Sequence, residues 1–203
     1  MFVVAMENEN IGQIYGNSAE APYINQTLIP TSARATEFID ELGLSVPSEP
    51  HYVWMGGGDE RLRGSHLHDR RFAVREQQHG HHGASGYLCH DMHGASGCPG
   101  GDLVQAGDDW LSLNLPPLIA FANARAAVVF LVWDEGDASG HVPFMAIGPG
   151  IKPGYAGSQT YTHSSLLKTI EEILGLPILP AVTAANDLSD LFAPGAAPSS
   201  TPP

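Results

Sequence analysis

The stretch "AVVFLVWDEGDASGHVPF", residues 127–144, begins as a buried strand and changes character within two residues. Six apolar residues, Val128–Trp133, run directly into Asp134 and Glu135. Two adjacent carboxylates repel each other, and both lose solvation at the end of a core strand. The stretch therefore predicts a buried strand and, at its carboxyl end, a positive charge that meets the two acids.

Two further apolar runs predict neighbouring strands. Residues 2–6, "FVVAM", read as a buried strand that ends at Glu7 and Asn8, and residues 142–150, "VPFMAIGPG", read as a strand closed by Gly-Pro-Gly. Strands interleaved with helices indicate the α/β class, with a mostly parallel sheet sandwiched by helices. Parallel strands bring their carboxyl ends to one rim of the sheet, where functional residues are expected.

The sequence between the first strand and the acidic stretch gives weaker signals. Residues 21–43, "APYINQTLIPTSARATEFIDELG", are compatible with a helix in two pieces broken at Pro30. Residues 51–58, "HYVWMGGG", fit either a short strand or the start of a helix. Residues 59–86 are rich in Arg, His and Gly and show no period of 2 or 3.6. We expect an irregular loop there.

Two helices are predicted in the second half of the chain. Residues 108–124, "DDWLSLNLPPLIAFANA", predict a helix that is interrupted by its two adjacent prolines. Residues 162–176, "THSSLLKTIEEILGL", predict the clearest helix, with Thr162 or Ser164 as its cap and one apolar face. We expect residues 1–193 to form a single domain and the Pro/Ala/Ser-rich residues 194–203 to be a disordered tail.

Composition and short sequence features limit which binding partners and which cellular locations are expected. The 203 residues carry a net charge of −13, which makes a nucleic-acid partner unexpected. No apolar run approaches the ~18 residues that a transmembrane segment needs. The start "MFVVAMEN" is too short for a signal peptide, so either the chain as it stands is cytoplasmic or a leader is missing from this sequence, and the location stays open. Cys89 and Cys98 fit either a disulfide or two free thiols.

The acids at the two strand ends predict a cation site. Glu7 follows the predicted strand of residues 2–6, and Asp134 and Glu135 follow the predicted strand of residues 128–133. Three carboxylates could therefore converge. A cation would neutralise their repulsion. Oxygen ligands suit Mg²⁺, Mn²⁺ or Ca²⁺, and nearby histidines would admit Zn²⁺ or Fe. The alternative is that each strand ends in an acid because it reaches solvent there.

Histidines and one serine give further candidates. "CHDMHG" places Asp91 and His93 two residues apart, and His163 opens the last helix, although each alone also fits a surface or capping role. Ser48 stands between two prolines in "VPSEPHY". Such a serine is a nucleophile if a metal lowers the pKa of its hydroxyl, and otherwise it is a turn residue.

Taken in order, these strings resemble the bacterial phosphoesterase family over residues 2–58 and 87–192. That family includes acid phosphatases, phosphatidylinositol-3-phosphatase-type enzymes and phospholipase C relatives, within the alkaline-phosphatase superfamily. The resemblance implies an alkaline-phosphatase-like core. The matching strings are "MEN", "GNSAEAPYIN", "PSEPHYVWM", "CHDMHG", "GDDWL", "VVFLVWDEGD", "HVPFMAIGPGIKPG" and "YTHSSLLKTIEEILGLP".

The resemblance also implies roles for single residues. Ser48 matches the nucleophile, which is transiently phosphorylated during the reaction. The metal ligands carried over are Glu7, Ser48, Asp134 and Glu135. The phosphate-binding or metal-proximal groups carried over are Asn8, Asp91, His93 and His163.

The implied function is a metal-dependent hydrolase of phosphoric esters, acid-phosphatase or phosphatidylinositol-3-phosphatase-like, that works through a phosphoserine. Its substrate would be a small phosphate ester or a phospholipid head group, and such enzymes are commonly exported. Two departures accompany the match: His51 stands where the family usually has Asn, and the core is shortened in the middle, between Ser48 and "DMH". The alternative is therefore a truncated relic that binds metal or phosphate without turnover. The metal, the substrate and the oligomeric state stay open at this stage.

Overall fold

Five strands form one sheet in the order β1-β3-β4-β2-β5. The computed structural model describes residues 1–6, 9–43, 46, 48–58, 103–136 and 139–196, with the backbone alone at 48 and 49. The predicted loop 59–86 and residues 197–203 of the predicted tail lie outside these ranges. The strands are β1 (Phe2–Met6), β2 (Ala33–Ile39), β3 (Val129–Trp133), β4 (Phe144–Ile147) and β5 (Ala156–Thr162).

Four of the described strands run in the same direction. β1 pairs with β3 in parallel, and β2 pairs with β5 in parallel. β4 lies between the two pairs and is antiparallel to both β3 and β2. The predicted α/β class with a mostly parallel sheet is confirmed.

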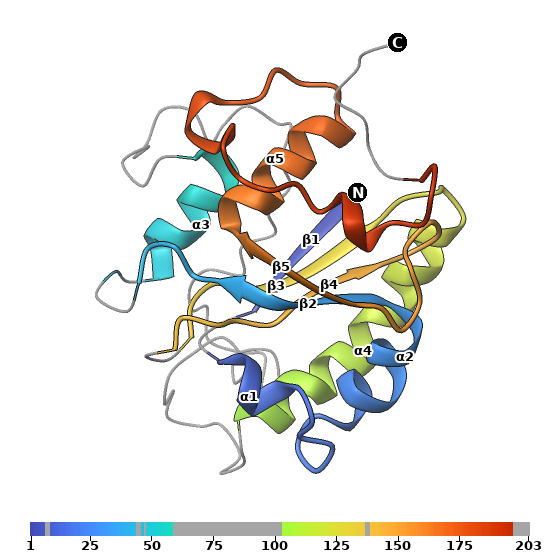
Figure 1. Ribbon diagram of the computed structural model, residues 1–203. Coiled ribbons are helices and arrows are strands. Elements are labelled where there is room, and N and C mark those ends of the chain that lie inside the picture. Colours follow the sequence, from blue (N-terminus) through green and yellow to red (C-terminus); the bar gives the residue numbers. More distant parts are fainter. Residues whose placement is uncertain (7–8, 44–45, 47, 59–102, 137–138, 197–203) are drawn as a thin grey trace, which may run out of the picture.

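Helices cover both faces of the sheet (Figure 1). α3 and α5 lie on one face, and α1, α2 and α4 lie on the other. Within the described ranges, no helix has the length and apolar character needed to cross a membrane. The helices and helical turns are α1 (Ile11–Ile14), the π-helical turn η1 (Ile24–Leu28), α2 (Ile29–Thr31), α3 (Ser48–Gly57), α4 (Leu103–Asn123), α5 (His163–Ile173) and the 3₁₀ turns η2 (Pro180–Val182) and η3 (Ser189–Leu191).

β3 is buried along its whole length, as its apolar run predicts. Helices on both faces leave a parallel strand no contact with water, so its side chains read as a continuous hydrophobic run. Phe144 of β4 stacks on Phe38 of β2 with ring centroids 4.6 Å apart, and its ring lies 5.9 Å from that of Phe130 in β3. Each such buried side chain contributes about 1.5–3 kcal/mol relative to its exposed state.

The prediction of a helix across residues 21–43 is wrong in its second half. Residues 24–31 are helical, but residues 33–39 form β2. β2 pairs with β4 on one side and β5 on the other, so its backbone groups find partners along both edges. That pairing overrides the local preference of an Ala-, Arg- and Glu-containing segment for a helix.

The expected interruption of the helix at Pro116 and Pro117 is also wrong, because α4 continues through both prolines. A proline at these positions removes an N–H group that would bond the carbonyl four residues earlier. Both prolines and Leu113 are exposed. Water can therefore take the place of the lost donors, while the opposite stripe of α4 stays packed on the sheet.

A buried acid in α4 holds the π-helical turn in place. The two carboxylate oxygens of Asp108 accept the backbone N–H groups of Tyr23 and Ile24, both at 2.8 Å. Burial raises the pKa of Asp108, the two N–H donors lower it and neighbouring Asp109 raises it, so that the net direction is upward. Asp108 thus ties the 21–28 segment to α4 through hydrogen bonds to backbone groups.

Candidate active site

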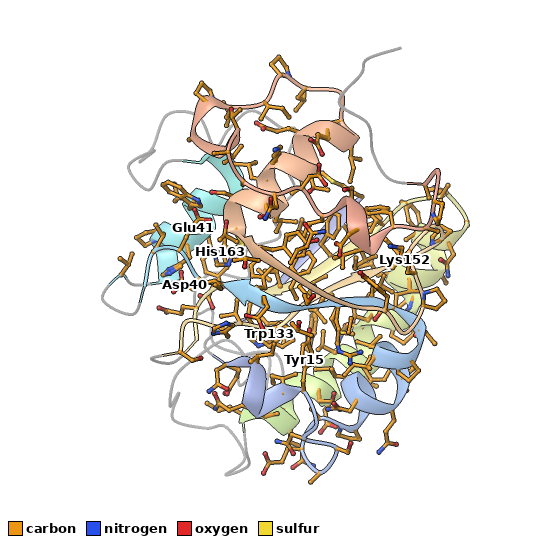
Figure 2. All side chains as sticks on the ribbon, viewed as in Figure 1. Tyr15, Asp40, Glu41, Trp133, Lys152 and His163 are labelled. Atoms are coloured by element: carbon orange, nitrogen blue, oxygen red, sulfur yellow. The ribbon has the colours of Figure 1, made fainter. Side chains whose placement is uncertain are left out.

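The carboxyl ends of four parallel strands meet at one edge of the sheet. Met6, the last residue of β1, lies opposite Trp133 of β3, and the Asp134 N–H donates to the Met6 carbonyl at 3.1 Å. β2 leads into Asp40 and Glu41, and β5 leads into His163. Figure 2 shows Asp40, Glu41 and His163 gathered at this edge, whereas Lys152 lies at the opposite one. This edge is the candidate active site.

The acidic pair at the end of β3 is buried. Asp134 is fully buried and Glu135 is 8% exposed. An oxygen of the Asp134 carboxylate accepts the N–H of Glu135 at 2.7 Å, which fixes the side chain against its own backbone. Two consecutive carboxylates removed from water need a compensating charge or a bound proton.

The donor chemistry of this pair fits a hard divalent cation. Carboxylate oxygens are the ligands that Mg²⁺, Mn²⁺ and Ca²⁺ prefer. Across the part of the chain that the structure describes, no group of three or more His, Cys, Asp or Glu side chains is arranged to hold a metal. Asp134 and Glu135 are two of the predicted ligands, and the other two, Glu7 and Ser48, have side chains that are not described.

Several predicted site residues lie outside the described residues. These are Glu7, Asn8, Asp91 and His93, together with Cys89 and Cys98. Ser48 is described through its backbone, as the first residue of α3. The convergence of Glu7, Ser48 and the acidic pair stays a prediction.

A histidine–carboxylate pair joins the end of β2 to α3. His51 Nε2 lies 2.9 Å from an Asp40 oxygen, and both side chains are buried. The same oxygen accepts the Leu42 N–H at 3.0 Å. The second oxygen, Asp40 Oδ2, has no hydrogen-bond partner among the described residues.

The charged form of Asp40 is favoured in this environment. Burial alone would raise the pKa of Asp40, but the hydrogen bonds from His51 and Leu42 and the charges of His51 and His163 outweigh it. The net result is a lowered pKa. A buried carboxylate stays ionised when donors and positive partners surround it.

His163, the first residue of α5, packs beneath the end of β3. Its Nε2 lies 3.0 Å from the Trp133 carbonyl. Because a carbonyl only accepts, that nitrogen carries the proton in the neutral ring. Burial lowers the pKa of His163, against the opposing effects of the Trp133 carbonyl and Asp40. Nδ1 has no hydrogen-bond partner among the described residues.

A second set of polar contacts links the end of β2 to α3 and α5, the two helices on one face of the sheet. The Glu41 carboxylate accepts the backbone N–H and the hydroxyl of Ser164, both at 2.7 Å. The Ser164 hydroxyl oxygen in turn accepts Trp54 Nε1–H of α3 at 3.0 Å. A carboxylate at this position also stabilises the N-terminal end of α5, where the helix dipole is positive.

Sequence reasoning missed the contributions of Asp40, Glu41 and His51. Asp40 and Glu41 fell inside the expected helix of residues 21–43, so nothing placed them at a strand end. The sequence distinguishes His51 only by its position, where the family usually has Asn. The one available signal was the pattern of a strand followed at once by two acids, the same pattern that identified Asp134 and Glu135.

Two comparisons with known proteins bear on this edge of the sheet. The model of the phosphoesterase family matches residues 84–177, a range that contains the acidic pair and His163. A phosphatidylinositol-3-phosphatase of Mycobacterium tuberculosis is 30% identical over 104 residues, which make up 50% of this chain. The aligned part is 32% of that relative, so the chain spans about a third of the relative's length.

The matched range includes three of the elements that build the candidate active site. β3 supplies the acidic pair, β5 leads into His163, and α5 begins with it. Ser48, Asp40 and His51 lie before the matched range. The family match thus extends over residues 84–177, the part of the chain that carries the acidic pair and His163.

Proposed function

We propose that the chain is a metal-dependent hydrolase of phosphoric ester bonds that works through a phosphoserine intermediate. The observation that carries the proposal is the buried Asp134–Glu135 pair at the end of β3, inside the range that matches the family model. The described end of β1, which leads into Glu7, lies directly beside it. A buried pair of carboxylates at a strand-end site is a costly arrangement unless it binds something positive.

Four residues would hold the cation: Asp134, Glu135, Glu7 and Ser48. When bound, a divalent ion would offset the charge of the acids, favour the ionised serine and neutralise charge on a phosphoryl group. The buried carboxylates fit such an ion by their ligand type.

Ser48 would attack the phosphorus atom of the substrate. A bond forms between Ser48 Oγ and phosphorus, and the bond to the ester oxygen breaks as the alcohol leaves. Water then attacks the phosphoserine, which releases inorganic phosphate and restores Ser48. Because Ser48 is the first residue of α3, a phosphoryl group there would lie at the end of a helix that favours negative charge.

The substrate proposed is a phosphate monoester, either small or part of a phospholipid head group. The phosphatidylinositol-3-phosphatase relative supports the second kind. Asn8, Asp91, His93 and His163 are the proposed substrate-binding residues. Donors on these residues would bind the phosphoryl oxygens that do not react.

The test is hydrolysis of p-nitrophenyl phosphate and of a phosphoinositide carrying a 3-phosphate, with metal analysis of the purified protein. We expect Ser48→Ala and Asp134→Asn each to lower kcat by roughly a thousandfold or more, and a chelator to suppress the wild type. Acid-quenched wild type should gain the mass of one phosphoryl group on the peptide that contains Ser48.

Matched controls are Ser158→Ala near the start of β5 and Asp109→Asn in α4, because both side chains are exposed and neither follows the carboxyl end of a strand. Both should keep wild-type kcat. Full activity in folded Ser48→Ala would contradict the phosphoserine mechanism. Full activity in a chelated, metal-free protein would contradict the metal requirement.

A second candidate is a relic that binds without turnover, and it is favoured by the shortened stretch between Ser48 and "DMH". It predicts that Mn²⁺ and inorganic phosphate raise the Tm by mass action while no substrate is hydrolysed. Turnover that Ser48→Ala abolishes would exclude it.

A further inference from the structure

The position of α3 determines where Ser48 lies. Ser48 is the first residue of α3 and His51 follows one turn later. Residues three apart share one face of a helix, and each side chain leans toward the turn before it. Any contact that fixes His51 therefore also fixes the turn that begins with Ser48.

Two consecutive residues at the end of β2 hold α3 from different points. Asp40 contacts His51 in the first turn of the helix, with 2.9 Å between the carboxylate oxygen and Nε2. Glu41 reaches Trp54, one turn further, through the Ser164 hydroxyl. Since β2 lies inside the sheet between β4 and β5, both contacts start from a rigid strand end.

The Asp40 contact is the more strongly constrained of the two. Both side chains are excluded from water, and the Leu42 N–H holds the same oxygen that faces His51. A buried ion pair of this kind resists rearrangement, because loss of one partner leaves the other buried and uncompensated.

We propose that Asp40 and His51 are a positioning pair, in which the close contact between the Asp40 carboxylate and His51 Nε2 sets the place of Ser48 relative to the strand ends. This inference rests on the proposed function of Ser48 as the nucleophile. Neither residue touches the phosphoryl group: each acts on the reaction through the first turn of α3. A displacement of the nucleophile by about 1 Å lowers kcat by on the order of a hundredfold.

Two substitutions at position 51 separate positioning from any chemistry of the ring. The amide nitrogen of Gln lies about as far along the side chain as His Nε2, whereas that of Asn lies where Nδ1 does. Neither amide takes up an extra proton at neutral pH, so neither becomes positively charged. His51→Gln therefore keeps a donor toward Asp40, and His51→Asn removes it.

We expect His51→Asn to lower kcat for p-nitrophenyl phosphate about a hundredfold, with KM within about twofold, and His51→Gln to restore most of kcat. Asp40→Ala should match His51→Asn, and the double variant should be no worse than either single one. The partly exposed His141, which lies 3.1 Å from Glu37, offers the control pair. His141→Asn and His141→Gln should leave kcat unchanged.

Amide hydrogen exchange over residues 48–57 gives a readout that does not need activity. His51→Asn should speed exchange there, and His51→Gln should not. An active wild type in which His51→Asn keeps its kcat, or in which folded His51→Gln is as impaired as His51→Asn, overturns the positioning role. A wild type without turnover that still shows the exchange difference overturns the proposed function and leaves the hold of Asp40 on α3 standing.

Discussion

Asp108 in α4 and Asp40 at the end of β2 are both almost fully buried, 2% and 6% exposed, yet their pKa values move in opposite directions. Burial raises the pKa of Asp108 even though two backbone N–H groups bond its oxygens. The pKa of Asp40 is lowered, because His51 and the Leu42 N–H outweigh the same effect of burial.

The difference lies in the partners. Asp108 faces backbone dipoles, with the charge of Asp109 nearby, and its role is to join two segments. Asp40 faces two histidines that can carry charge, at the edge where four strands end. A buried acid that only holds the fold together is satisfied by neutral donors, whereas an acid at the candidate active site depends on ionisable partners.

The largest expected effect on stability comes from removing the Asp108 carboxylate from its two backbone N–H partners. Asp108→Ala leaves the Tyr23 and Ile24 N–H groups without their acceptor, which should lower the free energy of unfolding by about 3 kcal/mol. Urea denaturation measures it. Asp108→Asn keeps one acceptor oxygen and should lose roughly half as much.

Asp109→Asn, an exposed neighbour, is the control for Asp108 and should change the free energy of unfolding by less than about 0.5 kcal/mol. A loss below about 1 kcal/mol in Asp108→Ala would mean that water replaces the carboxylate, and the contrast with Asp40 would then weaken.

A second, smaller effect is the pH dependence of the two acids. The lowered pKa of Asp40 contributes stability that is present above about pH 4 and is lost as the pH falls through the folded-state pKa. The raised pKa of Asp108 does the reverse: its contribution is present below about pH 4 and is lost as the pH rises through the folded-state pKa.

Urea midpoints between pH 3 and pH 7 would test these opposite signs. The destabilisation caused by Asp40→Asn should shrink as the pH falls, and that caused by Asp108→Asn should shrink as the pH rises. Parallel pH profiles for the two variants would contradict the assignment of different partners.

The smallest expected effect concerns a second His–carboxylate pair. His141 and Glu37 lie 3.1 Å apart, with side chains 32% and 47% exposed. Exposed ion pairs contribute little, so Glu37→Gln should change the free energy of unfolding by no more than about 0.5 kcal/mol in urea denaturation. A loss as large as that of Asp40→Ala would show that burial is not what distinguishes the two pairs.

The parts of the fold that were predicted correctly are those with a local signal. The apolar runs of β1 and β3 and the amphipathic pattern of α5 each identify an element without reference to the rest of the chain. β2 carries no such signal, since small and charged residues alternate with apolar ones, and pairing with β4 and β5 decides its conformation. β5 is an edge strand with mostly exposed residues, so hydrophobicity could not find it.

The candidate site follows the same division. The sequence identifies Asp134 and Glu135 as candidates because its apolar run identifies the strand that precedes them. Asp40 pairs with His51 across eleven positions of sequence, and that pairing depends on a strand that local patterns misassign. His163 was identified as the start of a helix, but its contact with the Trp133 carbonyl depends on how α5 crosses the sheet.

The backbone around the acidic pair is held at three successive points. The Trp133 N–H bonds the Pro143 carbonyl, the Trp133 carbonyl bonds His163, and the Asp134 N–H bonds the Met6 carbonyl. These three hydrogen bonds restrict how far the backbone around the acidic pair can move. If the pair binds the proposed cation, selectivity among ions would depend on ionic radius and hydration, because the backbone could adapt little to an ion of another size.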